Sequence, residues 1–198
     1  MSFSPWRSHL ETALDRNHHL PFSRYFQLAT ITPMGYPANR TVVFRGFFQD
    51  SDRLKIITDS RCEKLEQIQH CQWGEICWYF SETREQFRLL GQLIIVDETE
   101  SDLLLKQEWR STWQSLSEAT RIQFTWPPSK EKRQYNSSSL FSSSPRDRES
   151  LSEPLENFNL LLLEPKKVDY LRLRGNPQNR YLYVLNSSSI WEEMEVNP

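Results

Sequence analysis

"RTVVFR" (residues 40–45), "QDSD" (49–52) and "LKIIT" (54–58) decide the fold of this chain. Two short runs rich in β-branched and apolar residues flank a polar tetrapeptide, a pattern typical of two strands joined by a turn. If the strands pair as an antiparallel hairpin, residues whose numbers sum to about 101 lie opposite each other. That register predicts that Arg40 lies near Arg61.

Arg40, Arg61 and Lys64 together predict a phosphate site built from side chains. Residues 62–70 are expected to form a short helix with Lys64 in its first turn, where unpaired N–H groups and the positive dipole end favour an anion. Cations on a solvated hairpin are the alternative interpretation. However, Arg40 and Arg45 bracket an apolar stretch, where a cation costs free energy unless an anion receives it. The sequence therefore favours a bound phosphate dianion.

Glycine-rich phosphate loops are absent from this sequence. Its five glycines are widely spaced, and the closest pair, Gly35 and Gly46, is 11 residues apart. Neither G-x-G-x-x-G nor a Walker loop can be written. A nucleotide-like ligand is therefore expected to be held by Arg, Lys, Ser and Thr side chains.

Chain length and net charge limit the number of domains and the kinds of partner that we expect. The chain has 198 residues, which fits one domain over residues 1–198. Lys and Arg total 24 against 26 Asp and Glu, so the net charge of -2 gives no field that attracts nucleic acid or an anionic membrane. No run approaches the roughly 20 apolar residues of a spanning helix, and no targeting pattern is present. We expect a cytoplasmic protein.

Cysteines and histidines do not predict a metal site. Cys62, Cys71 and Cys77 are odd in number and lack C-x-x-C spacing, so reduced thiols are expected rather than a disulfide framework or a zinc site. The adjacent His18 and His19 diverge on a helix and alternate faces on a strand, and no acidic or cysteine partner stands at ligand spacing.

Apolar periodicity predicts a few helices and many antiparallel strands. Helices are expected at 5–16, at 62–70, from Ser101 or Asp102 through Trp113, and from 117. Strands are expected at 25–31, 36–48, 54–58, 75–80, 86–96, 158–163, 168–173, 181–185 and 190–196, the first five as a meander. Residues 129–150, rich in Ser and charge, predict a mobile loop or a plain linker. The pattern favours a mainly β, antiparallel barrel with peripheral helices over a doubly wound sheet.

Three motifs carry a resemblance to a known family. They are residues 40–45, the run 58–68 that opens at Thr58 and contains Lys64, and residues 85–91 with Gln86 before Gly91. In order and spacing the chain resembles the pyridoxamine 5'-phosphate oxidase family of FMN-binding split barrels. Residues 168–170 and 191–198 resemble the last two strands of that family, so the likeness spans nearly the whole chain.

The resemblance implies FMN as the cofactor and assigns roles to particular residues. Arg40, Arg61 and Lys64 would neutralise its phosphate, with Thr58 and Ser60 as hydroxyl donors. Arg61 would supply a guanidinium that the family carries later, because Cys62 and Glu63 stand where the family has Ser and Arg. The further assignments are backbone groups of Thr41, Val42 and Val43 facing the isoalloxazine ring, Gln86 reaching the FMN of a partner subunit, Arg180 near the flavin, and Arg45, in place of the family's lysine, at the substrate.

The resemblance implies an FMN-dependent oxidoreductase acting on a small amine or related organic substrate, as a homodimer with FMN at the subunit interface. Asn176 and Gln178, however, stand where the oxidases of the family carry an arginine and a histidine for the substrate phosphate. A non-catalytic flavin carrier or sensor is therefore a second hypothesis, and an anion-binding structural barrel without flavin is a third. No protein nucleophile is needed, and no catalytic residue is assigned.

Overall fold

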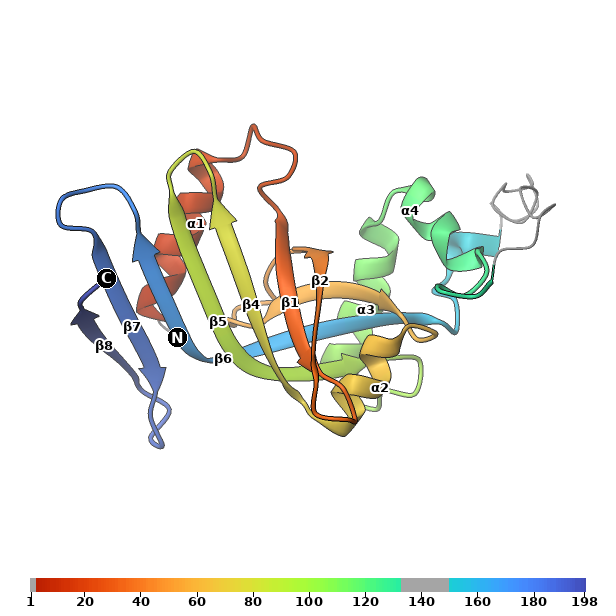
Figure 1. Cartoon of the computed structure of the whole chain (residues 1–198). Helices are drawn as coiled ribbons and strands as arrows, with labels where there is room; N and C mark the ends of the chain where they lie inside the picture. Colours follow the sequence, from red (N-terminus) through yellow and green to blue (C-terminus); the bar gives the residue numbers. More distant parts are fainter. Residues whose placement is uncertain (1–2, 133–149) are drawn as a thin grey trace. The chain divides into compact units, whose positions relative to one another are not determined.

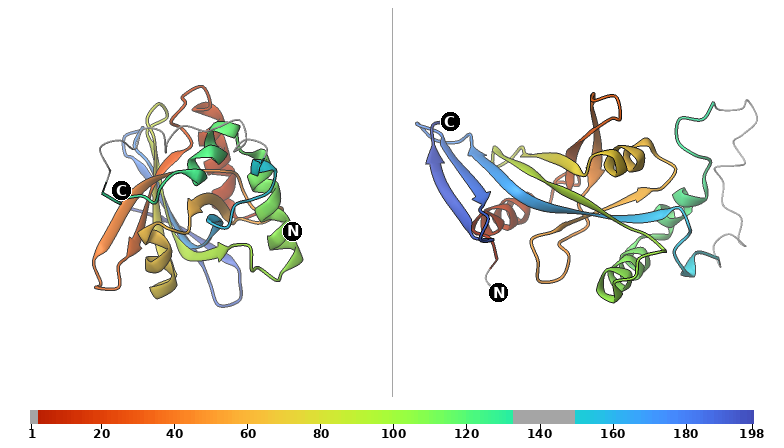
Figure 2. Two further views of the ribbon diagram at one scale, coloured as in Figure 1. Left: turned by 90° about the vertical axis from the view of Figure 1, so that its right-hand side faces the viewer. Right: turned by 90° about the horizontal axis from the view of Figure 1, so that it is seen from below.

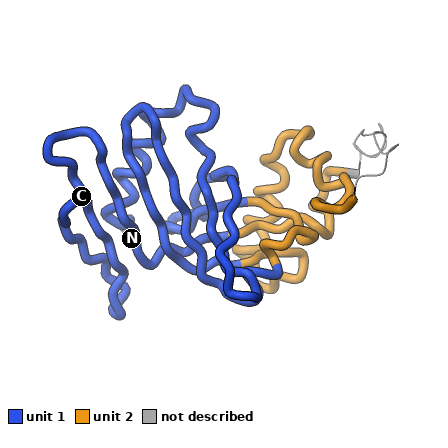
Figure 3. The backbone as a smooth tube through the Cα atoms, in the orientation of Figure 1, with its two compact units in different colours: residues 1–56, 66–94, 162–198 blue, residues 57–65, 95–161 orange. Residues whose placement is uncertain are grey.

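The computed structural model describes residues 3–132 and 150–198. The chain divides into two compact units, which are described separately here (Figure 3). Unit 1 comprises residues 1–56, 66–94 and 162–198, and unit 2 comprises residues 57–65 and 95–161. Most of the Ser-rich segment predicted as a loop, residues 133–149, lies outside the described residues.

Antiparallel pairing around β1 organises the first part of unit 1. β1 (Tyr25–Ile31) pairs with β2 (Pro37–Val43) on one side and with β4 (Trp73–Phe80) on the other. β4 pairs in turn with β5 (Glu85–Val96), and Figure 1 shows these strands side by side. β2 begins the strand order, so it is an edge strand of the sheet among the described residues.

β6 (Phe158–Arg172) is a 15-residue strand that pairs with three others. It pairs with β5, with β7 (Asn179–Leu185) and with β3 (Leu54–Asp59), and β7 pairs with β8 (Trp191–Val196). Residues 158–163 are all 3% exposed or less. Burial on both faces explains why this part of β6 is apolar at every position except Asn159, rather than alternating.

Helix α1 (Pro5–Arg16) packs in unit 1 against the C-terminal strands (Figures 1 and 2). Its buried face presents Trp6 to Trp191 of β8, with ring centroids 5.9 Å apart, and His9 stacks on Tyr170 of β6 at 5.0 Å. Pro5 suits the first turn, where no intrahelical N–H bond is lost.

Two of the remaining helices follow a polar N-cap residue. α2 (Glu63–His70) follows β3, and α3 (Leu103–Ser115) begins at Asp102, whose carboxylate accepts the N–H groups of residues 104 and 105. Ser117 caps α4 (Glu118–Ile122), which continues into the 3-10 turn η1 (Gln123–Thr125). A separate 3-10 turn, η3 (Ser150–Ser152), precedes β6. Within unit 2, rings of Trp109, Trp113, Phe124 and Phe158 pack together as the core.

The predicted mainly β, antiparallel class and most element positions are confirmed, but three details differ. β2 pairs with β1, so the Cα partner of Arg40 is Leu28, and the predicted hairpin that brought Arg40 opposite Arg61 is wrong. Of the predicted hairpin, the structure contains only the turn, which is closed by an isolated antiparallel bridge between Phe47 and Leu54. The expected five-strand meander is wrong for the same reason, because β1 pairs with β4. Finally, the two strands predicted at 158–163 and 168–173 are one continuous β6.

Candidate functional site

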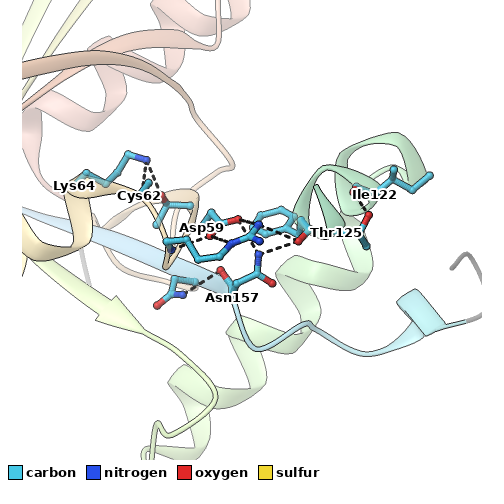
Figure 4. Close-up of polar contacts among 10 residues, drawn as sticks. Asp59, Cys62, Lys64, Ile122, Thr125 and Asn157 are labelled. Carbon is cyan, nitrogen blue, oxygen red and sulfur yellow. Dashed lines mark hydrogen bonds and ion pairs between the residues drawn. The ribbon is translucent and has the colours of Figure 1, made fainter. Parts of the chain in front are cut away.

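In unit 2, the first turn of α2 gathers an ammonium, a thiol and a hydroxyl. Lys64 Nζ donates to Thr58 Oγ1 at 2.7 Å and to Cys62 Sγ at 3.0 Å, and the hydroxyl and the thiol lie 3.1 Å apart. Figure 4 shows the Lys64 side chain turned back toward Cys62. Thr58 is 5% exposed at the end of β3. Neither acceptor is a carboxylate, so Lys64 makes no ion pair through these two contacts.

Arg61, also in unit 2, is held differently. Its guanidinium donates twice to the Asp59 carboxylate, from Nε at 2.9 Å and from Nη2 at 2.6 Å, and Nη2 also reaches Phe124 O at 3.2 Å. Asn157 Nδ2 donates to the same carboxylate at 2.7 Å (Figure 4). Burial alone would raise the pKa of Asp59, but hydrogen bonds from Arg61 and Asn157 hold it below its ordinary value. Two of Arg61's nitrogens therefore serve an internal ion pair.

In unit 1, the guanidinium of Arg40 lies on buried neutral oxygens. Arg40 Nη1 donates to Thr30 Oγ1 at 2.5 Å and to Leu28 O at 3.3 Å, and Nη2 donates to Gln67 Oε1 at 2.7 Å. Thr30 Oγ1 donates to the same Gln67 oxygen at 2.6 Å. This group is fixed in direction without being neutralised by these three acceptors.

Arg45 is a second cation of unit 1 with unmet hydrogen-bonding capacity. Its Nε is buried and has no hydrogen-bond partner among the described residues. Burial lowers the pKa of Arg45, and the positive charge of Arg24 lowers it further. A desolvated guanidinium next to a like charge is a site where an anion is favoured.

The other predicted residues of unit 1 lie on β2, β5 and β7. Residues 41–43 face Gln27, Phe26 and Tyr25 across the β1–β2 pair, and Val42 is buried while Thr41 is exposed. Gln86 pairs with Tyr79 across the β4–β5 pair. Arg180 on β7 makes a two-point ion pair with Asp169, at 2.9 and 2.7 Å, which raises the pKa of Arg180.

Within each unit, the structure therefore brings some predicted residues together and leaves others apart. Thr58 and Lys64 are in contact in unit 2, where Ser60 instead uses its N–H on Asn157 O at 2.9 Å. Thr30, Gln67 and Asp169 were not predicted, although each contacts a predicted arginine. Gln67 had one usable signal, since it stands one turn after Lys64 on the predicted helix.

The donor set fits a phosphate-bearing cofactor such as FMN. Lys64 donates to a hydroxyl and a thiol, Arg40 donates to neutral oxygens, and the buried Nε of Arg45 has no hydrogen-bond partner among the described residues. Anionic groups are bound most strongly by such partly desolvated cations. No cluster of three or more His, Cys, Asp or Glu side chains suited to a metal occurs in the described ranges 3–132 and 150–198.

Comparisons with known proteins identify the family to which the chain is similar. Residues 3–97 match the family described as "Pyridoxamine 5'-phosphate oxidase, FMN-binding domain". The chain is 39% identical over 198 residues to the Arabidopsis thaliana protein named pyridoxine/pyridoxamine 5'-phosphate oxidase 2, covering 98% of each chain.

Solved structures extend the similarity to the whole fold. A pyridoxamine 5'-phosphate oxidase-related, FMN-binding protein from Nostoc punctiforme PCC 73102 matches with a TM-score of 0.93 and 48% identity over 100% of both chains. PhzG from Burkholderia lata 383 matches in fold, with a TM-score of 0.76 at 18% identity, over 97% of this chain and 90% of that one. These matches confirm the predicted antiparallel split-barrel fold.

Proposed function

Because this chain belongs to the pyridoxamine 5'-phosphate oxidase family of FMN-binding proteins, we propose that it is an FMN-dependent oxidoreductase acting on a small amine or related organic substrate. One observation carries the proposal beyond the similarity itself. The predicted phosphate ligand Lys64 is hydrogen-bonded to a hydroxyl and a thiol, which orient the ammonium without placing a carboxylate on it. Cations that served only surface ion pairs would show carboxylate partners, as Arg61 does.

The chain's own groups account for cofactor binding. Lys64 would bind the FMN phosphate with the Thr58 hydroxyl beside it. Arg40, in unit 1, is a separate candidate for binding an anionic group of the cofactor. Each charge-assisted hydrogen bond is worth about 1.5 to 3 kcal/mol, or roughly a tenfold to hundredfold change in affinity. The free edge of β2 would offer backbone donors and acceptors from Thr41 and Val43 to the ring system.

The flavin supplies the capacity to accept a hydride equivalent from the substrate. The protein's contribution is positive charge held in a fixed orientation. Arg180 is suited to this, since Asp169 grips Nε and Nη2 and leaves Nη1 to face a ligand. Arg45 and the neighbouring Arg24 would attract an anionic substrate, which fits the phosphorylated substrates in the name of the Arabidopsis relative.

We propose a homodimer as the functional form. On β1 and β4, Tyr25 and Tyr79 alternate with buried residues such as Phe26 and Trp78, so the two tyrosines lie on the opposite, outer face of the sheet. Tyr25 is 48% and Tyr79 47% exposed, and Gln86 pairs with Tyr79 on that face. An exposed aromatic face of this kind favours association with a second copy.

A flavin carrier or sensor without turnover is the second candidate. The observation in its favour is that Asn176 and Gln178 before β7 carry no charge, where the family's oxidases place an arginine and a histidine. In that case FMN would be retained, and no pyridoxine or pyridoxamine phosphate would be oxidised.

One purification and one mixing experiment test these proposals. The purified protein should carry FMN, identified by chromatography of the flavin released on denaturation. Lys64→Met and Arg40→Met should each lower its occupancy, whereas the exposed controls Lys130→Met and Arg16→Met should not. Anaerobic addition of pyridoxamine or pyridoxine 5'-phosphate should bleach the flavin absorbance. Retained FMN without bleaching favours the carrier, and a protein that binds no flavin contradicts both candidates.

A further inference from the structure

Gln67 is a buried polar residue of unit 1 to which the proposed function gives no role. It lies on α2 and is 4% exposed, and its partner Thr30 on β1 is 1% exposed. Burying an amide and a hydroxyl costs free energy unless each is hydrogen-bonded. Here Thr30 and Gln67 are hydrogen-bonded to each other, and both accept from the guanidinium of Arg40.

The geometry is that of a two-point clamp. Arg40 Nη2 donates to Gln67 Oε1 at 2.7 Å, while Nη1 donates to Thr30 Oγ1 at 2.5 Å. Thr30 in turn donates its proton to Gln67 Oε1 at 2.6 Å, so the single amide oxygen anchors both partners. Because both Nη atoms are engaged by groups that are themselves buried, the plane of the guanidinium is fixed relative to the sheet.

The clamp residues Gln67 and Thr30 are neutral, unlike the carboxylate partners of two other arginines. Arg61 is paired with Asp59, and Arg53 with Glu164, in each case through a carboxylate. A carboxylate at the clamp would hold the same guanidinium but would cancel much of its attraction for a phosphate. An amide oxygen orients the guanidinium without itself adding a negative charge beside it.

We infer that Gln67 is a positioning residue, which acts through Arg40 to strengthen the binding of the FMN phosphate. The inference rests on the proposed function, since it names a phosphate ester as the group that Arg40 receives. A purely structural role for Gln67 makes a different prediction, because loss of packing would weaken the binding of any flavin equally.

Riboflavin separates the two roles, because it carries the same ring system without the phosphate. The quantity to measure is the ratio of the dissociation constant of riboflavin to that of FMN, obtained by flavin fluorescence titration of apoprotein. Gln67→Glu should lower this ratio about tenfold or more, which corresponds to about 1.4 kcal/mol. Gln69→Glu, the same charge change at an exposed position of the same helix, should alter it far less.

Dependence on Arg40 completes the test. In an Arg40→Met background, Gln67→Glu should leave the ratio unchanged, since the residue through which it acts is gone. Gln67→Leu, which removes the anchor without adding charge, should also lower the ratio in the Arg40 protein. Equal weakening of FMN and riboflavin by Gln67→Glu, or an undiminished effect in the Arg40→Met background, would overturn the inference.

Failure of the proposed function has a separate signature. If the wild-type chain binds neither flavin, the FMN proposal fails, and the inference is judged by thermal stabilisation with inorganic phosphate. A smaller phosphate-induced shift in Gln67→Glu than in Gln69→Glu would support an oriented anion site at Arg40. Equal shifts in the two variants, or no shift in the wild type, would overturn the inference as well.

Discussion

At the scale of single residues, the partner of each cation indicates what that cation is available to do. Arg61 donates from two nitrogens to the Asp59 carboxylate, whereas Lys64 donates to a hydroxyl and a thiol. A carboxylate neutralises its partner and competes with an incoming phosphate, and a neutral acceptor does neither. We therefore expect Lys64 to contribute more than Arg61 to anion binding, although both were predicted as phosphate ligands.

Cys62 offers a direct chemical readout of that site. Its half-buried thiol lies 3.0 Å from Lys64 Nζ, so a phosphate bound by Lys64 should cover it. Saturating FMN should slow alkylation of Cys62 by iodoacetamide by roughly tenfold, a change typical of a well-formed charged contact. Peptide mapping by mass spectrometry measures the rate at each cysteine. Cys71 and Cys77 serve as internal controls, and equal rates at Cys62 with and without FMN would contradict the assignment of Lys64.

Asp59 should make the stability of the chain sensitive to acid. Since hydrogen bonds from Arg61 and Asn157 lower the pKa of Asp59 below its ordinary value, its contribution is fully present above about pH 4 and is lost as the pH falls through the lowered value. Thermal unfolding of the wild type and Asp59→Asn should therefore differ near neutral pH, and the difference should shrink below about pH 4. A difference that is constant with pH would show that the ion pair does not stabilise the fold.

Part of the site could be predicted from local spacing, and part could not. Thr58 and Lys64 are six residues apart across a strand end and a helix start, and their contact follows from that local geometry. The clamp on Arg40 joins β1, β2 and α2, so Thr30 and Gln67 become its neighbours only through tertiary packing. No local pattern in the sequence specifies such a contact.

At the scale of elements, the wrong hairpin has an identifiable cause. Residues 25–31 and 54–58 are both short apolar runs, and strand pattern alone does not say which of them pairs with residues 37–43. Gly46, with φ of +101°, turns the chain soon after β2 ends at Val43. Hydrogen bonds then join Arg45, Gly46 and Lys55 in a short turn structure, and β2 is left to pair with β1.

β5 requires a residue without a side chain at Gly91, because the β6 backbone lies close to it. A Cβ added there would lie 2.2 Å from Glu164 O and 2.9 Å from Pro165 Cα of β6, and backbone atoms cannot move aside cheaply. Gly91→Ala should therefore lower the free energy of unfolding by about 3 kcal/mol or more, as overpacking between strands does. Chemical denaturation of the apoprotein measures the loss.

Gly35→Ala is the matched control for that substitution. Gly35 has φ of +81° and no atom within 4 Å of an added Cβ, so the cost there is confined to backbone conformation. We expect about 1 kcal/mol at Gly35. Equal losses at the two positions would mean that close contact between β5 and β6 does not explain the need for Gly91.

At the scale of the whole molecule, the sequence predicted the class and the family, while strand pairing had to come from coordinates. Alternating apolar residues and turn residues predicted the positions of most strands, because both signals are local in the sequence. β6 was divided in two since Pro165 and two lysines interrupt its apolar pattern, yet the strand runs continuously from Phe158 to Arg172. No helix in the described part of the chain is long and apolar enough to span a membrane.

In the proposed homodimer, the outer sheet face of unit 1 is the subunit interface. A charged substitution on that face tests this assignment. Tyr79 is 47% exposed on β4 and pairs with Gln86, which is expected to reach the FMN of the partner subunit. Tyr79→Asp should place a charge in the centre of that surface and shift the protein toward monomer in sedimentation velocity. Tyr36→Asp, at an exposed tyrosine on the turn before β2, should leave the assembly unchanged.

Cofactor retention should follow the change in assembly. If each FMN takes a contact from the partner subunit, the Tyr79→Asp monomer should lose FMN on dilution, while the Tyr36→Asp protein should keep it. Gln86→Ala should weaken FMN binding without dissociating the dimer, because its side chain would contact the cofactor rather than hold the interface. A Tyr79→Asp monomer that binds FMN as tightly as the wild type would show that each subunit builds its site alone.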